Sequence, residues 1–223
     1  MPLPEPVRTE AIRYAQNDLS GDLQWHVDYF DFIDDDLLRE RVGQEFYSAR
    51  FLYKLWEGLR IDGLWANQAQ VQIQVQQYAS IYEACIHHLL FEVAKETDPV
   101  KNLGTYRTLK ERALPGNIME KIESMDSADA LDIVGAVYRS SKTQVSKVKF
   151  PDKVAAAVEL GIVSPELGDE IAEFYKARNY IHIHAELRNS GVDWKIDFAR
   201  DAYRRMLPFR DQASAWVVNF KKS

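Results

Sequence analysis

Residues 71–94, VQIQVQQYASIYEACIHHLLFEVA, decide between a helical and a β-rich fold. The opening segment, VQIQVQ, alternates apolar residues with glutamine, which is the period of a half-buried strand. The residues on both sides of it place apolar side chains three and four positions apart, which is the period of an amphipathic helix. We therefore predict one long helix from about Leu64 to Glu96, with a strand over VQIQVQ as the alternative.

The helical period continues along most of the chain, and no segment combines strand alternation with flanking turn signals. Ser164 followed by Pro165 is typical of a helix start, and Gly161 is typical of a helix end. Further helices are predicted over about residues 7–19, from the acidic run 34–36 to about 60, and over 128–138, 151–160, 165–190 and 194–220, the last bending at Pro208. The sequence thus predicts an all-α protein with a single domain over residues 1–223.

Composition limits the classes of protein to which this chain can belong. With 223 residues, 46% of them hydrophobic, the chain can bury a sizeable core. One cysteine, Cys85, excludes an internal disulfide framework. We find no secretory signal and no apolar run long enough to span a membrane, so we expect a cytoplasmic protein without a membrane partner.

Charge is distributed unevenly. The net charge of −6 argues against a surface coated in basic residues for holding long nucleic acids. Residues 138–150, YRSSKTQVSKVKF, nevertheless carry four cations and no acid. This run indicates either a solvated loop or an edge that binds RNA phosphates. Its cations are Arg139, Lys142, Lys147 and Lys149.

Residues 175–186, YKARNYIHIHAE, contain the most unusual combination of side chains. On an ideal helix Arg178 and His182 lie in the middle of an apolar stripe, and His184 lies about 120° away from it. A buried arginine requires a partner, because an unpaired charge in a core costs several kcal/mol. Glu83, in the long helix, is the candidate partner. A structural ion pair between Arg178 and Glu83 is the simplest interpretation.

The segment RNYIHIH also resembles the signature of the HEPN superfamily of helical domains. That signature has an arginine, usually a polar residue after it, and a histidine about four to six residues beyond the arginine. Arg178 and His184, with five residues between them, meet this spacing, whereas His182 does not. The preceding run DKVAAAVELGIVSPELGDEIAEFYKARN and the earlier YASIYEACIHHLL are similar to the helices of such domains. The resemblance implies an antiparallel helical bundle with a core at about 64–190, N-terminal helices over 7–63 and a C-terminal helix over 194–220.

The resemblance further implies a metal-independent endoribonuclease that acts as a homodimer with a composite cleft. Such proteins are often toxins or effectors in defence and stress responses, sometimes with an antitoxin as partner. In the implied chemistry Arg178 binds the phosphate, and His184, or His182 as the second choice, acts as base or acid. Asn179 would position the phosphate or end the helix, and Glu83 would orient Arg178 or tune a histidine.

Other chemistries fit the sequence less well. Neither CIHH (85–88) nor HIH (182–184) has the spacing of a helical zinc site, so no metal or other cofactor is expected. Serine nucleophile and phosphate-loop motifs are missing from the sequence. The competing interpretation is a catalytically inactive helical module that binds a partner protein or a nucleotide.

Overall fold

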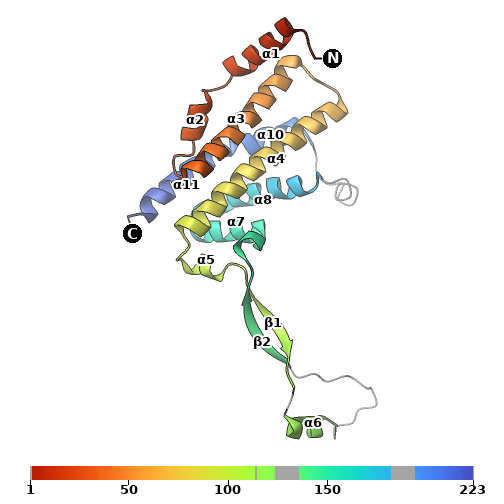
Figure 1. Ribbon diagram of the computed structural model, residues 1–223, viewed down its shortest axis with the longest axis vertical. Helices are drawn as coiled ribbons and strands as arrows, with labels where there is room; N and C mark the ends of the chain where they lie inside the picture. The colour runs from red at the N-terminus through yellow and green to blue at the C-terminus, as the bar shows by residue number, and fades with distance from the viewer. Residues whose placement is uncertain (1, 114, 124–135, 182–193, 223) are drawn as a thin grey trace. The chain divides into compact units, whose positions relative to one another are not determined.

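The computed structural model describes residues 2–113, 115–123, 136–181 and 194–222 (Figure 1). Two compact units are present, Met1–Lys101 with Lys149–Ser223, and Asn102–Val148. Residues 102–148, which the sequence analysis placed inside one domain, therefore form a compact unit of their own. We call the two parts the helical unit and the hairpin unit.

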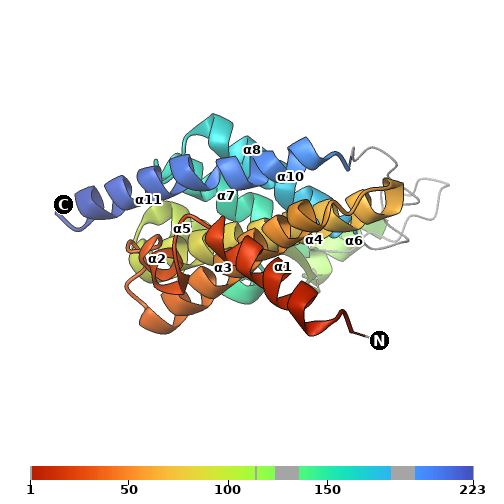
Figure 2. The ribbon, with the colours of Figure 1, turned by 90° about the horizontal axis from the view of Figure 1, so that it is seen from above.

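The helical unit is mostly α-helix, as the sequence predicts. Its central element is α4 (Leu64–His88), which continues as the π-helical turn η1 (Leu89–Val93). Figure 2 shows α1 and α3 on one side of α4, and α8 and α10 on the other. The remaining elements are α1 (Glu5–Asn17), α2 (Leu23–Asp28), α3 (Asp36–Leu59), α5 (Asp98–Asn102) at the border of the unit, α7 (Phe150–Glu159), α8 (Pro165–Asn179), α10 (Ile196–Arg204) and α11 (Met206–Phe220).

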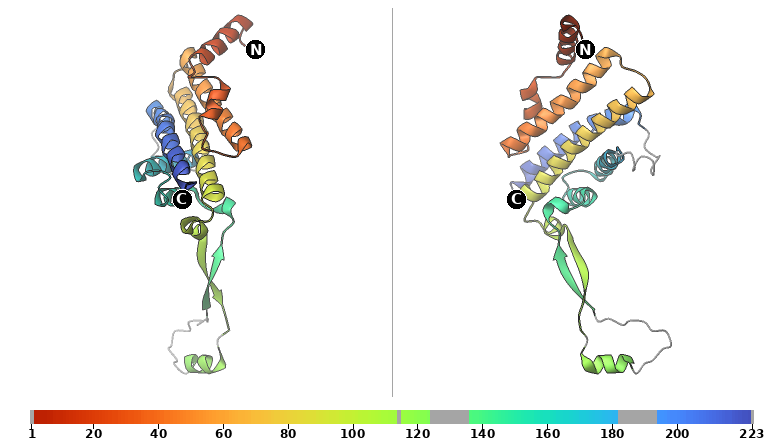
Figure 3. Two further views of the ribbon diagram at one scale, coloured as in Figure 1. Left: turned by 90° about the vertical axis from the view of Figure 1, so that its left-hand side faces the viewer. Right: turned by 45° about the vertical axis from the view of Figure 1, so that its right-hand side comes forward.

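The strand alternative for VQIQVQ is wrong, because residues 71–76 lie inside α4. Two glutamines, Gln70 and Gln74, are four residues apart and buried on one helical face. The side-chain amide of Gln74 donates a hydrogen bond of 2.9 Å to the carbonyl oxygen of Ala49 in α3. Gln74 thus belongs to the contact between two antiparallel helices, α3 and α4 (Figure 3).

Capping residues confirm three of the predicted helix ends, the starts of α3 and α8 and the end of α7. The Ser164 hydroxyl accepts the Leu167 N–H at 3.3 Å at the start of α8, with Pro165 in the first turn. Gly161, just after α7, has a φ of +71°, the left-handed region that glycine occupies at low cost. Asp35, from the acidic run, caps α3 by accepting the Leu38 N–H at 3.0 Å.

The described residues are mostly helical, consistent with the predicted all-α class, but the sequence analysis missed one pair of strands. In the hairpin unit β1 (Thr105–Glu111) pairs antiparallel with β2 (Ala136–Lys142), from Thr105 opposite Lys142 to Glu111 opposite Ala136. The helix predicted over 128–138 is replaced by strand at 136–138, and its earlier part lies outside the described residues. Most residues of both strands are exposed, so neither face has the apolar alternation that identifies a half-buried strand. The unit also contains α6 (Gly116–Glu123) and the 3-10 turn η2 (Val145–Lys147).

Helix α2 and the end of α8 differ from the prediction. Helix α2, which the sequence analysis missed, is capped by Asp22, whose carboxylate accepts the Trp25 N–H at 2.9 Å. Helix α8 ends at Asn179, earlier than expected, and the Tyr180 N–H bonds the carbonyl of Ala177 at 2.9 Å in a tightened last turn.

The predicted C-terminal helix divides into α10 and α11 at Arg205, three residues before Pro208. Proline has no N–H to donate to the carbonyl four residues earlier, at Arg204, so the interruption falls one turn before it. The predicted bend at Pro208 is therefore displaced toward the N-terminus by that turn.

Candidate functional site

Arg178 and Glu83 meet where α8 packs against α4. A small core cluster of Val71, Val75, Ala177 and Ala199 joins α4, α8 and α10 beside this point. Nη1 of Arg178 lies 2.5 Å from Oε2 of Glu83, which makes the predicted ion pair. The two side chains are 31% and 30% exposed, so both carboxylate and guanidinium remain in contact with solvent. Tyr175, one turn earlier, places its ring 5.4 Å from the Arg178 guanidinium carbon.

By helical spacing Arg178 lies on the buried face of α8, but its side chain is only partly buried. The buried residues of α8 include Leu167, Ile171, Phe174 and Ala177, and Arg178 follows Phe174 by one turn, near the end of the helix. The pair is thus not a dry core contact, and its charges cost less than a fully buried pair would. Asn179, the last residue of α8, is exposed.

His182 and His184 lie outside the described residues. Helix α8, on which the sequence analysis placed both histidines, ends at Asn179 with Tyr180 as its C-cap. The sequence proposal that one of them is the proton-transfer group therefore stays a prediction.

A second polar pair, Lys153 and His87, lies beside the first. Nζ of Lys153 is 3.2 Å from Nδ1 of His87, and the lysine is only 4% exposed. His87 follows Glu83 by one turn of α4, so the two share a helical face. Lys153 comes from α7, which packs against both α4 and α8. The ring of Phe150 in α7 lies 4.3 Å from that of Tyr175 in α8, which connects these two helices.

Burial controls the protonation of this second pair. Burial lowers the pKa of His87, Lys153 lowers it further, and Glu83 opposes both. Burial also lowers the pKa of Lys153, whereas the negative charge of Glu83 raises it. Two adjacent cations repel, and Nδ1 can accept a hydrogen bond from a lysine ammonium only when it carries no proton. We infer that His87 is neutral when Lys153 is charged.

The structure therefore gathers two cations, one carboxylate and one imidazole on α4, α7 and α8. The sequence analysis named Arg178 and Glu83 but missed Lys153 and considered His87 only as a metal ligand. A signal for Lys153 was present, since it lies one turn before Ala156 and Ala157, both buried in α7. A lysine at that spacing is placed on the apolar face of its helix.

The basic run of residues 138–150 falls on several elements. Arg139 and Lys142 are exposed on β2, where the sequence allowed a loop, and Lys147 is exposed in η2. Lys149 precedes α7 as its exposed N-cap residue in the helical unit. The partner strand β1 adds the exposed cations Arg107 and Lys110, so the paired strands carry more positive than negative charge.

The described residues contain neither a metal-binding cluster nor a membrane-spanning helix. Within them, no three His, Cys, Asp or Glu side chains gather so that they could hold a metal ion. Cys85 is buried, which raises its thiol pKa. None of the helices described is long and apolar enough to cross a membrane.

Comparison of the chain with protein-family models, curated proteins and solved structures gave no match. The arguments for its function therefore come from the residues themselves.

Proposed function

We propose that the protein is a metal-independent endoribonuclease of the HEPN type, which cleaves RNA by attack of the 2'-hydroxyl on the neighbouring phosphorus. The observation that carries the proposal is the Arg178–Glu83 ion pair, which is about a third exposed and whose arginine lies on the last turn of α8. Its guanidinium is accessible to a ligand, and a carboxylate from another helix fixes its direction.

Each step of the reaction has a candidate group. The Arg178 guanidinium binds two phosphate oxygens and stabilises the negative charge that develops on the phosphorane. Glu83 positions Arg178 without touching substrate. His184 exchanges the proton of the 2'-hydroxyl or of the 5'-oxygen, with His182 as the alternative, and Asn179 contacts the phosphate.

Lys153 and His87 add to this proposal a second source of positive charge. A phosphate at Arg178 would attract the Lys153 ammonium, although Lys153 is too buried to be a simple surface contact. We assign to the pair a positioning role beside Glu83, whose charge raises the pKa of both His87 and Lys153 against the effect of burial.

RNA would be held through its backbone. The cations Arg139, Lys142, Lys147 and Lys149 are exposed and would bind phosphates without reading sequence. The rings of Tyr106 and Tyr138, 48% and 72% exposed on the two strands, could stack on unpaired bases. The proposal includes a homodimer with a composite cleft, and a toxin or effector role that an antitoxin would restrain.

The test incubates the purified protein with a mixed-structure RNA in EDTA. Wild type is compared with Arg178→Ala, His184→Ala and the control Arg41→Ala, which removes an arginine from an exposed ion pair on α3. We expect fragments ending in 2',3'-cyclic phosphate from wild type and control, and intact RNA from the other two variants. Intact RNA with every well-folded protein would overturn the proposal.

The alternative is a catalytically inactive helical module that binds a partner. It is favoured by the ion pair itself, because Glu83 already neutralises Arg178, as in a purely structural contact. Expression discriminates the two, since an active toxin should be harder to produce in wild-type form than as Arg178→Ala. Equal yields of both would favour the inactive module.

A further inference from the structure

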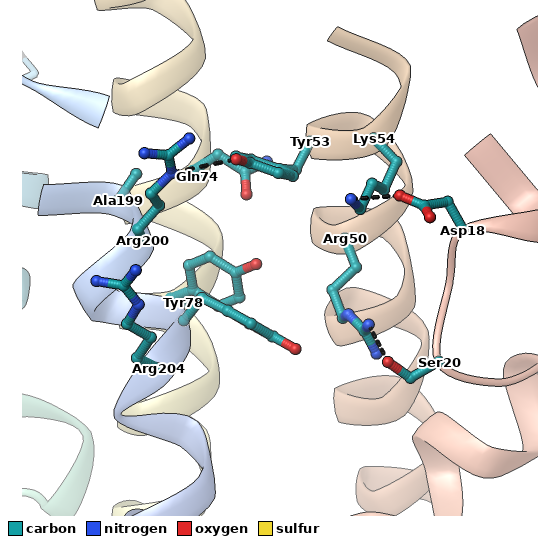
Figure 4. A pocket seen from close by; sticks show the side chains of 11 residues that line it. Asp18, Ser20, Arg50, Tyr53, Lys54, Gln74, Tyr78, Ala199, Arg200 and Arg204 are labelled. Atoms are coloured by element: carbon teal, nitrogen blue, oxygen red, sulfur yellow. Dashed lines mark hydrogen bonds and ion pairs between the residues drawn. The ribbon is translucent and has the colours of Figure 1, made fainter. Parts of the chain in front are cut away.

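The helical unit contains a cavity of about 370 Å³ between α3, α4, α10 and the segment that follows α1 (Figure 4). This volume lies in the range of ligand pockets, about 300–1,000 Å³. Four cationic side chains line the cavity, Arg50 and Lys54 from α3 and Arg200 and Arg204 from α10. Asp18 is the one carboxylate among the described lining residues, so positive charge dominates the wall.

Arg50 is the most unusual of these cations. It is 8% exposed, and Figure 4 shows its guanidinium directed toward Ser20. Nη2 donates to the Ser20 hydroxyl at 2.6 Å, and Nη1 lies 3.1 Å from Nε2 of His26. The guanidinium also lies 5.4–5.8 Å from the ring centres of Trp25, Phe46 and Tyr203.

The partners of Arg50 are neutral. Nδ1 of His26 lies 2.6 Å from the carbonyl oxygen of Asp22, so Nδ1 holds the proton and Nε2 is left to accept from Arg50. Burial lowers the pKa of His26, and the positive charge of Arg50 lowers it further. The hydrogen bond to the Asp22 carbonyl acts in the opposite direction and raises this pKa. Among the described residues no carboxylate forms an ion pair with Arg50. A cation removed from water in this way is costly unless an anion accompanies it.

The other cations of the cavity wall already form ion pairs with carboxylates, most of them exposed to solvent. Lys54 bonds Asp18 and Glu57. Arg200 and Arg204 each lie 3.2 Å from an aspartate one turn earlier on α10, Asp197 and Asp201. These α10 pairs are solvent-exposed, and such pairs contribute about 0–1 kcal/mol, so a ligand anion could compete with them.

The same wall carries three phenol rings, from Tyr53, Tyr78 and Tyr203. The Tyr53 hydroxyl accepts from Nε of Arg200 at 3.2 Å, which connects α3 with α10 across the cavity (Figure 4). Aromatic faces and hydroxyls beside a group of cations suit a ligand that has both an anionic group and a planar ring.

We propose that this cavity binds a nucleoside phosphate, with Arg50 as the anchor of the phosphate and Arg200 and Arg204 as further contacts. The tyrosine rings would face the base or the sugar. None of the described residues that line this cavity belongs to the group formed by Arg178, Glu83, Lys153 and His87. The proposed nucleotide binding therefore does not depend on whether the protein cleaves RNA.

Binding is tested by calorimetric titration of the full-length protein with each of the four nucleoside monophosphates, and with the matching nucleosides. We expect at least one monophosphate to bind, and its nucleoside to bind at least about tenfold more weakly, because charge-assisted hydrogen bonds to the phosphate are lost. Absence of binding by all four monophosphates would overturn the proposal, as would equal binding of nucleoside and monophosphate.

Variants locate the site. Arg50→Gln should weaken binding about tenfold or more. Because Arg50 also holds Ser20 and His26, Arg204→Gln provides a second test that leaves those contacts intact. The control Arg41→Gln removes the same charge from an exposed position on α3 and should bind as wild type does. Affinity that is unchanged in Arg204→Gln and in a folded Arg50→Gln, or reduced equally in Arg41→Gln, would place the ligand elsewhere and overturn the proposal.

Discussion

Arg178 and Arg50 occupy opposite situations in the same helical unit. Arg178 is 31% exposed and bound to a carboxylate, whereas Arg50 is 8% exposed and bound to a hydroxyl and an imidazole. The arginine with more access to water therefore has its charge neutralised, and the buried one does not. An ion pair can thus serve mainly to position a side chain, whereas a buried cation with neutral partners is a candidate binding site for an anionic ligand.

The largest expected effect is on catalysis at Arg178. If Arg178 binds the transition-state phosphate, Arg178→Ala should lower the initial rate of RNA cleavage about 100–1,000-fold, the range for loss of one oxyanion donor. Its free energy of unfolding should change by less than about 1 kcal/mol, because the pair with Glu83 is about a third exposed and screened by solvent. Cleavage rates and urea unfolding measure the two effects. A large stability loss with an equal loss of cleavage in Arg178→Ala would make Arg178 a structural residue.

Stability should respond more strongly at Arg50. Arg50→Met keeps an apolar stem but leaves Ser20 and Nε2 of His26 without their partner and removes the cation from three aromatic rings. We expect a loss of about 2–4 kcal/mol in the free energy of unfolding. Urea unfolding of Arg50→Met beside Arg178→Met measures this difference directly. An Arg50→Met protein as stable as wild type would show that the desolvation cost of the cation cancels its contacts, and would break the comparison.

The two regions also share a feature, since each contains a histidine beside a cation. Burial lowers the pKa of both His26 and His87, so the folded protein takes up their protons at lower pH than the unfolded chain does. Their contribution to stability is complete above the unfolded pKa of about 6.5 and is lost as pH falls toward their folded pKa values. We expect the free energy of unfolding to fall from pH 7 to pH 5 by up to about 1.4 kcal/mol per pH unit for each histidine.

Substitution separates the two contributions. His26→Gln should remove the part that belongs to the Arg50 region, and His87→Gln the part that belongs to the Lys153 region. Unfolding measured at several pH values in each variant gives the two slopes. A wild-type slope that neither substitution reduces would assign the pH dependence to other groups.

The sequence predicted those features that depend on local pattern. Apolar spacing and caps gave the main helices, and the need of Arg178 for a partner led to Glu83, 95 residues away in the chain. The paired strands escaped prediction because exposed strands are stabilised by their mutual hydrogen bonds and carry little apolar alternation.

The sequence analysis missed Arg50 for a different reason. In the segment YSARF it resembles a surface arginine of an amphipathic helix, and its polar partners are neutral residues 24 and 30 positions away. Charge pairing can be guessed from sequence because opposite charges attract wherever they lie. A cation held by a hydroxyl, an imidazole and aromatic rings has no oppositely charged residue that the sequence would reveal as its partner. These groups come together only in the folded chain.

The smallest effect tests how firmly Arg50 is held. Ser20→Ala removes the hydroxyl that accepts from Nη2 of Arg50 at 2.6 Å, and we expect a loss of about 1–2 kcal/mol in the free energy of unfolding. Ser80→Ala is the matched control, because the Ser80 hydroxyl bonds the Gln76 carbonyl of its own helix, α4, and its loss should change stability by less than about 0.5 kcal/mol. Added nucleoside monophosphate should restore part of the loss in Ser20→Ala, since an anion on Arg50 replaces the missing acceptor. An equal loss in both serine variants, with no recovery on adding the nucleotide, would mean that Arg50 is fixed by its aromatic neighbours and not by Ser20.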